Sequence, residues 1–242
     1  MIASLKQDFA PTGTLRAAIN LGNPILAGTH PETKKPQGVS IDLANALATE
    51  LGCPLELVVV TTAAQSVQAV TEDRADVGFF AIDPVRGEHL QFTAPYLLIE
   101  GAYMVRNESP INRNEDVDQP GLRVTVGKGS AYDLFLSREL KQADIVRAPS
   151  SPEVVDVFLR DQIPVAAGVK QQLEADAQRL GGLRLLPGHF MLIQQAMGLS
   201  RQRPVEALAA LHDFIERHKR SGFIDQALQR HSIQGVSVAP AA

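Results

Sequence analysis

The sequence has one cysteine, no excess of basic residues and no long apolar run, and each of these absences excludes a class of protein. Cys53 alone cannot form an intramolecular disulfide, and it lacks the paired spacing of a metal or redox motif. The 23 basic and 27 acidic residues give a net charge of -4 and form no stripe that could neutralise phosphates, which argues against a nucleic-acid partner. Apolar runs such as LELVVV are far shorter than the roughly 20 residues that a bilayer-spanning helix needs.

Catalytic and metal-binding spacings are also missing from the sequence. The six histidines are scattered, and His189 in PGHFM is isolated from other titratable residues. Because neither a Ser/His/Asp arrangement nor a cluster of metal ligands is visible, we expect no metal, no cofactor and no enzymatic activity.

What the sequence does contain is one pattern of strands and helices that occurs twice. The first copy alternates strand-like and helical segments at residues 15–20, 39–52, 55–60, 66–74 and 76–81. The second copy does the same at residues 122–127, 130–140, 144–148, 151–161 and 163–169. A βαβαβ order predicts a mainly parallel sheet flanked by helices. The sequence therefore predicts an α/β fold with two lobes.

Two further strand-like segments, residues 97–106 and 191–200, connect the copies to each other and to a helical tail at residues 203–228. If this tail returns to the first lobe, the first lobe is discontinuous and two strands join the lobes as a hinge. We therefore predict lobe one at residues 1–103 plus 194–242, and lobe two at residues 104–193.

Ligands of open α/β sheets bind beyond the carboxyl ends of the strands, a rule that here selects residues 20–23, 81–86, 127–133 and 168–171. In GKGSAYD, glycines on either side of Lys128 allow close approach of the backbone, and Ser130 begins a helix. The free N–H groups of a helix start attract anions, so a ligand carboxylate would fit there. The alternative is that Ser130 only caps its own helix.

The loop AIDPVR raises a similar choice for Arg86. Asp83 and Pro84 have the residue types of a helix N-cap and first helical position, which explains both structurally. Arg86 lies three residues past the cap, where a positive charge is unfavourable against the helix dipole, so an anionic ligand would relieve the conflict. The alternative is an ordinary surface arginine.

Four segments carry a resemblance to a known family: LRAAINLGNP, GVSIDLANALATELG, DPVRGEHLQFTAPY and VGKGSAYDLFL. From residue 14 to residue 231 the chain resembles the periplasmic solute-binding proteins of amino-acid ABC transporters, the bacterial extracellular solute-binding proteins of family 3. The resemblance implies the two-lobed type II periplasmic-binding-protein fold, with lobes that close on the ligand and a tail that returns to lobe one. It implies that Arg86 binds the ligand carboxylate and that the backbone around Ser130, Ala131 and Tyr132 completes the contact.

The departures from the family pattern concern the ligand. Family members that bind α-amino acids carry an Asp for the ammonium group after the last strand of lobe two, where this chain has Gly168 or Val169 followed by Lys170. Because an uncompensated ammonium in a closed apolar cleft costs several kcal/mol, a carboxylate with an apolar or weakly polar body is expected instead. Lys128 and Lys170 would then be candidates for a second positive centre that binds a diacid.

The first loop and the third strand also depart from the family. Asn23 replaces an aromatic residue, and Phe79, Phe80 and Ala81 stand where hydroxyl and glycine residues are usual. The predicted ligand-binding residues are Asn20, Asn23, Phe79, Phe80, Ala81, Arg86, Lys128, Ser130, Ala131, Tyr132, Val169 and Lys170.

The resemblance implies a monomeric solute-binding component of an ABC-type importer, with a small carboxylate-containing solute and an ABC permease as partners. It implies a periplasmic location, while the N-terminal MIASLKQDFAPTG has no apolar signal segment and leaves the cytoplasm as the alternative. Two other functions stay open. A similar cyclohexadienyl dehydratase would need a positioned general acid, for which Asp83, Asp133, Glu153 and His189 are poor candidates. A ligand-sensing module could use the same fold.

Overall fold

The computed structural model describes residues 2–242 and divides them into two compact units. Unit 1 contains the described residues up to Leu98 together with Gln194–Ala242, and unit 2 contains Ile99–Ile193. The chain therefore passes between the units twice, within β7 (Leu97–Arg106) and within β12 (Met191–Ser200). The crossings predicted from the sequence lie at 103/104 and 193/194. That the units act as lobes which close on a ligand stays a prediction.

In unit 1, a parallel sheet has β1 (Leu15–Asn20) at its centre. Both β4 (Leu55–Val60) and β5 (Val77–Ala81) pair with β1 in parallel, and the end of β12 pairs with β5 in the antiparallel direction. β6 (Leu90–Phe92) pairs with the end of β12, and β13 (Ser237–Val238) pairs with Leu97 and Leu98 of β7.

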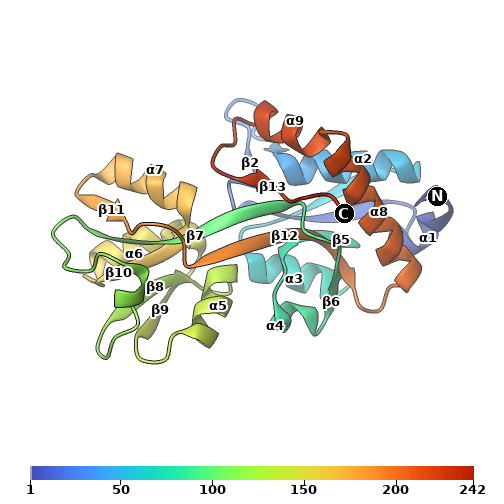
Figure 1. The fold of residues 1–242 in the computed structure, drawn as a ribbon. Helices are drawn as coiled ribbons and strands as arrows, with labels where there is room; N and C mark the ends of the chain where they lie inside the picture. Colours follow the sequence, from blue (N-terminus) through green and yellow to red (C-terminus); the bar gives the residue numbers. More distant parts are fainter. Residues whose placement is uncertain (1) are drawn as a thin grey trace. The chain divides into compact units, whose positions relative to one another are not determined.

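Helices cover both sides of this sheet. Figure 1 shows α2 (Val39–Leu51) and α3 (Ala63–Thr71) on opposite sides of the β1 and β4 strands, and α9 (Phe223–Arg230) beside α2. The remaining elements are η1 (Ile2–Leu5), α1 (Lys6–Phe9), β2 (Gly28–Thr29), β3 (Pro36–Gln37), α4 (Pro84–Gly87) and α8 (Val205–Arg220).

Unit 2 repeats this strand order. β8 (Arg123–Gly127) lies between β9 (Asp144–Ala148) and β10 (Val165–Val169), all three parallel, and β7 pairs with β10 in the antiparallel direction. β11 (Leu183–Leu185) pairs with β7. Its helices are η2 (Asn114–Asp116), α5 (Ala131–Glu139), η3 (Ser151–Glu153), α6 (Val154–Arg160) and α7 (Lys170–Leu180).

Successive side chains along the strands of unit 2 point to opposite faces of the sheet, and each face has its own hydrophobic core. Val165 and Ala167 of β10 pack in a cluster with Tyr132 and Leu136 of α5. Ala166, between them, packs in a second cluster that includes Leu173 of α7. Because successive strand residues face opposite sides, helices on both faces are needed to bury them. The predicted α/β fold, with a mainly parallel sheet flanked by helices in each unit, is confirmed.

Local sequence explains most element boundaries. Gly38 precedes α2 with φ +134°, and a Cβ there would meet the Leu26 carbonyl oxygen at 2.5 Å, so only glycine fits. α3 begins three residues earlier than predicted, because Thr62 and Gln65 form a reciprocal capping box. The predicted helix at 151–161 begins as η3 and continues as α6.

Candidate functional site

The strand order defines where each unit can bind a ligand. In unit 1 the order is β4-β1-β5, and in unit 2 it is β9-β8-β10, so β1 and β8 each lie between two strands that come later in the chain. The chain crosses from the central strand to its neighbour on one side and then back to the strand on the other side. Ligands of open α/β sheets bind at the carboxyl ends of the strands where this change of direction occurs. All four predicted ligand loops follow β1, β5, β8 and β10.

Arg86 is buried at the carboxyl end of β5, with 6% of its surface exposed. Its Nη1 donates a hydrogen bond to the Ala81 carbonyl oxygen at 3.1 Å. Burial lowers the pKa of Arg86 to about 10, while the nearby Asp83 carboxylate opposes this shift. The guanidinium therefore stays charged at neutral pH although it is almost completely desolvated.

The structure revises the reason for regarding Arg86 as special. Asp83 is the N-cap of α4, accepting a hydrogen bond from Val85 N at 2.9 Å, and Pro84 is the first helical residue, as predicted. However, α4 is one turn long, so its dipole is small, and Arg86 is not a surface residue. Burial of the charge, rather than conflict with a dipole, distinguishes this arginine.

The side chains of Asn20, the last residue of β1, and of Asn23, in the loop that follows, form local hydrogen bonds. Asn20 Oδ1 accepts a hydrogen bond from Gly22 N at 2.9 Å, and Asn23 Oδ1 accepts one from Ile25 N at 3.2 Å. Both side chains are half-buried. Their polar groups therefore shape the loop, and a role toward a ligand stays a prediction.

The two phenylalanines of β5 point to opposite faces of the sheet. Phe80 is 2% exposed and belongs to the α3-side core cluster of unit 1, while a Cβ at Gly78 or Gly198 would meet its ring. The ring of Phe80 thus packs in the core of unit 1, and a contact of Phe80 with a ligand stays a prediction. Phe79 packs edge-on against Tyr96, and with Ala81 it stays a candidate.

Gln195 of β12 was not singled out from the sequence, although it lies on the same face of the sheet as Ala81, its antiparallel partner. Its side chain is buried, and Oε1 has no hydrogen-bond partner among the described residues. A buried polar atom of this kind costs about 1–3 kcal/mol unless a partner arrives, which makes Gln195 a further candidate for ligand contact. The presence of a glutamine inside a mainly apolar strand is the feature of the sequence that could have identified Gln195 as a candidate.

In unit 2 the first turn of α5 has the geometry of a capped helix start. Ser130 Oγ accepts a hydrogen bond from Asp133 N at 3.0 Å, and Asp133 Oδ2 accepts one from Gly129 N at 2.8 Å. The Asp133 carboxylate also accepts two hydrogen bonds from Arg147 Nε. Ser130 therefore caps its own helix, as the alternative interpretation held, and the N–H groups of Ala131 and Tyr132 remain the candidates for an anion.

Gly127 serves the fold rather than a ligand. A Cβ at this position would meet the Ser151 backbone at 2.8 Å, so glycine allows η3 to approach β8. Tyr132 is 2% exposed and its hydroxyl donates a hydrogen bond to Ser151 Oγ at 2.8 Å. Gln172 Nε2 donates a hydrogen bond to Ser151 O at 3.3 Å. Ser151 thus holds the starts of α5, η3 and α7 at one edge of unit 2.

At the end of β10, Val169 is buried and Lys170 begins α7. Lys170 Nζ donates a hydrogen bond to Glu100 Oε2 at 2.5 Å, and His189 Nδ1 lies 3.4 Å from Glu100 Oε1. Lys170 is therefore paired with a carboxylate in this structure, and its role as a second positive centre stays a prediction. Lys128, by contrast, is exposed in its loop.

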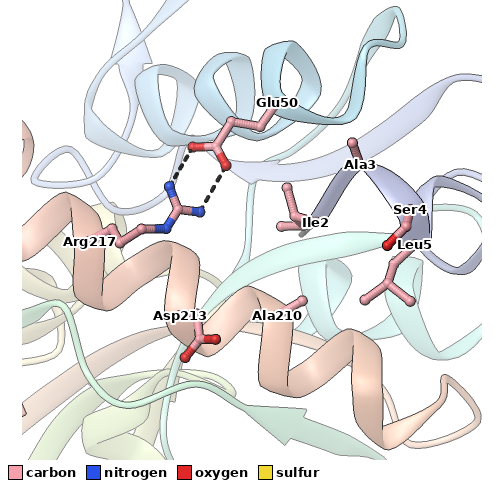
Figure 2. A pocket seen from close by; sticks show the side chains of 8 residues that line it. All are labelled: Ile2, Ala3, Ser4, Leu5, Glu50, Ala210, Asp213 and Arg217. Carbon is pink, nitrogen blue, oxygen red and sulfur yellow. Dashed lines mark hydrogen bonds and ion pairs between the residues drawn. The ribbon is translucent and has the colours of Figure 1, made fainter.

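Unit 1 also contains a cavity of about 460 Å³ away from these loops. It is open to solvent and lined by residues of η1, α2 and α8, and a double hydrogen bond from Arg217 to Glu50 crosses one side of it (Figure 2). None of the residues that line it was predicted as a ligand contact.

Across residues 2–242, no group of three or more His, Cys, Asp or Glu side chains could hold a metal ion. No helix in the same range has the length and apolar composition needed to cross a bilayer.

Comparisons with known proteins agree with this architecture. A mutant of ArgBP from T. maritima has a TM-score of 0.79 at 19% identity, covering 95% of this chain and 99% of that chain. The solute receptor for L-cysteine of Neisseria gonorrhoeae has a TM-score of 0.79 at 21% identity, covering 95% and 92%. Cyclohexadienyl dehydratase of Pseudomonas aeruginosa is 29% identical over 119 residues, which are 47% of this chain and 44% of that enzyme.

The family model of the bacterial extracellular solute-binding proteins, family 3, matches residues 16–233. The chain therefore belongs to this family, and its fold is the type II periplasmic-binding-protein fold.

Proposed function

We propose that this protein is the solute-binding component of an ABC-type importer and that Arg86 binds a carboxylate of its ligand. The observation that carries the proposal is the charged guanidinium of Arg86, a residue only 6% exposed at the carboxyl end of β5. A buried cation at the edge where α/β sheets bind ligands favours an anion, and the planar guanidinium matches a carboxylate with two parallel hydrogen bonds.

Apolar side chains beside Arg86 support a ligand with an apolar or weakly polar body. Ile82 directly precedes Asp83, Val85 directly precedes Arg86 within α4, and the two residues are 38% and 48% exposed. Large apolar groups left exposed next to a buried charge are typical of small-molecule sites, where a few polar groups orient a mainly apolar ligand.

By analogy with the family, the first turn of α5 in unit 2 takes part in holding the same ligand through the N–H groups of Ala131 and Tyr132, and the two units close on it. The periplasm is then the expected location and an ABC permease the expected partner. The protein is expected to act as a monomer.

The proposal is tested by finding the ligand with native mass spectrometry and measuring its affinity by titration calorimetry. Arg86→Lys should weaken binding, because a point charge cannot reproduce two parallel N–H bonds. Arg86→Met should cost about 2–5 kcal/mol of binding, because the ligand carboxylate loses its partner. Arg74→Met, at an exposed arginine paired with Glu72, is the matched control and should leave affinity unchanged. Equal affinity of wild type and Arg86→Met would remove the main support.

The partial match to a dehydratase makes that activity the second candidate. The titratable groups at the end of β10 are poorly suited to proton transfer, since the hydrogen bond from Lys170 lowers the pKa of Glu100 and the same bond raises the pKa of Lys170. Incubation with a cyclohexadienyl carboxylate, followed by mass spectrometry, should leave the compound intact. Its catalysed loss would favour the enzyme.

A further inference from the structure

The ion pair between Glu100 and Lys170 lies at the ligand-binding edge of unit 2. Gly101 of β7 pairs with Val169, the last residue of β10, so Glu100 is adjacent to the carboxyl end of that strand. Lys170 follows directly as the first residue of α7. The side chains of Glu100, Lys170 and His189 are 32%, 33% and 39% exposed, so the cluster is reachable from solvent.

Stability alone does not account for this pair. A cation at the first residue of an eleven-residue helix is unfavourable against the helix dipole, and the Glu100 carboxylate compensates for it. An ion pair with both partners partly exposed contributes little to folding. The pair nevertheless stands beside Val169, at the edge that the strand order marks for ligands.

The charges of the pair decide which ligand groups this edge accepts. Glu100 supplies a carboxylate that would attract a ligand ammonium, but the ammonium of Lys170 already holds it at 2.5 Å. A ligand ammonium would have to displace Lys170 and would meet its like charge. A ligand hydroxyl or carbonyl group is uncharged, so it need not displace Lys170 and is not repelled by it.

We propose that Lys170 is a specificity-determining residue: by occupying Glu100 it excludes ligands that carry an ammonium group and selects carboxylates without one, such as 2-hydroxy and 2-oxo acids. This inference rests on the proposed function, because it concerns the ligand of the same site. Removal of the Lys170 charge should uncover the Glu100 carboxylate as an acceptor for an amine.

The test compares pairs of ligands that differ in this group: L-alanine with L-lactate, L-phenylalanine with L-phenyllactate, and L-glutamate with L-2-hydroxyglutarate. Calorimetry at pH 7 is done on wild type, Lys170→Met, Lys128→Met and the double variant Glu100→Gln/Lys170→Met. Lys128→Met is the matched control, because it removes one positive charge from the same edge and leaves Glu100 paired.

Lys170→Met should bind at least one amino acid of the three pairs about tenfold or more tightly than wild type does, the change expected for one charge-assisted contact. Lys128→Met should show no such gain, and the double variant should lose it. A thermal melt shows whether Lys170→Met is folded, and the Glu100 pKa, followed by carboxyl-carbon NMR, shows whether the carboxylate has lost its contact with Lys170 while His189 remains near it. That pKa should rise.

A folded Lys170→Met variant with no gain for any of the three amino acids would overturn the inference, whatever wild type binds. The inference would also be overturned if the wild type bound an amino acid more tightly than the matching hydroxy acid. The proposed function has its own test. It fails if the wild type and Arg86→Met bind a carboxylate with equal affinity.

Discussion

At the scale of single residues, burial of Arg86 changes what its replacement should do to stability. A buried charge keeps a desolvation cost in the folded state, and an apolar side chain of similar length removes this cost but also leaves the buried Asp83 carboxylate without the attraction of the guanidinium. We expect Arg86→Met to lower the free energy of unfolding by less than Arg86→Ala does, because Met keeps most of the packing of the aliphatic stem. Arg86→Ala also removes the packed aliphatic stem and should cost about 1–3 kcal/mol.

Urea denaturation of both variants without ligand provides the measurement. A loss in Arg86→Met as large as that in Arg86→Ala would mean that the hydrogen bonds of the guanidinium, including the one to Ala81 O, hold the loop together. Arg86 would then have a structural role in addition to the proposed contact with ligand.

Residue types predicted part of the candidate site and missed the rest for a physical reason. Asp83 and Ser130 act as helix caps that local sequence identifies. The contact of Lys170 with Glu100 could not be predicted, because it joins residues 70 positions apart through the register of β7 on β10. The burial of Phe80 similarly depends on Gly78 and Gly198, which leave room for its ring.

At the scale of elements, Asp118 ties the segment before β8 to the turn between α5 and β9. Its carboxylate accepts hydrogen bonds from the backbone N–H groups of Lys141, Gln142 and Ala143 at 2.8–3.1 Å. These bonds, that of Ala143 first, lower the pKa of Asp118 from its ordinary 3.8. The charged form therefore stabilises the folded state above about pH 4, and this contribution is lost as the pH falls through the lowered pKa.

Asp118→Asn should make the stability of the protein less dependent on pH on the acid side. The difference in free energy of unfolding between wild type and variant should be largest above pH 4 and should shrink toward pH 2, as measured by urea melts at several pH values. Glu115→Gln, an exposed carboxylate of the neighbouring η2, is the control. A constant difference from pH 2 to pH 7 would show that the charge of Asp118 is unimportant.

Helix α8 anchors two other segments of unit 1 through a buried ion pair. Lys219 forms an ion pair with Glu216 and donates hydrogen bonds to Pro95 O at 3.2 Å and Pro240 O at 2.9 Å. Glu216 Oε2 accepts a hydrogen bond from Ala242 N at 2.7 Å. Removal of one partner leaves the other charge buried, so Lys219→Met should cost about 3–5 kcal/mol.

The double variant Glu216→Gln/Lys219→Met should be more stable than Lys219→Met alone, because no unpaired charge remains. Chemical denaturation of the wild type, both single variants and the double variant gives the coupling energy. Additive losses would show that the two side chains act independently and that the backbone contacts carry the stabilisation.

Elements differ in how well the sequence predicts them. The strands of both sheets were recognisable because β5 and β10 are buried at every position, and an apolar run shows this directly. Helix α7 was missed because Leu173 is its one buried residue, so almost no apolar period marks it. The antiparallel partners β6, β11 and β13 are two or three residues long and depend on strands already in place.

At the scale of the whole molecule, the chain enters unit 2 within β7 and leaves it within β12. Two connections that are both short and strand-like can act as a hinge, since a few φ/ψ changes in each would rotate the units as rigid bodies. We expect these changes near residues 100–105 and 191–196. Ligand binding shifts the population toward a closed form only if that form binds the ligand more tightly.

Small-angle scattering tests this closure. At saturating ligand, the radius of gyration of the wild type should decrease, because the proposed contacts of the ligand with Arg86 and with the start of α5 would favour a compact form. In Arg86→Met the same ligand concentration should leave the radius unchanged, since the variant lacks the proposed carboxylate contact in unit 1. Lys128→Met should compact as the wild type does for a monocarboxylate, because Arg86 is intact. Unchanged scattering of a wild type that calorimetry shows to be saturated would mean that binding occurs without closure of the units.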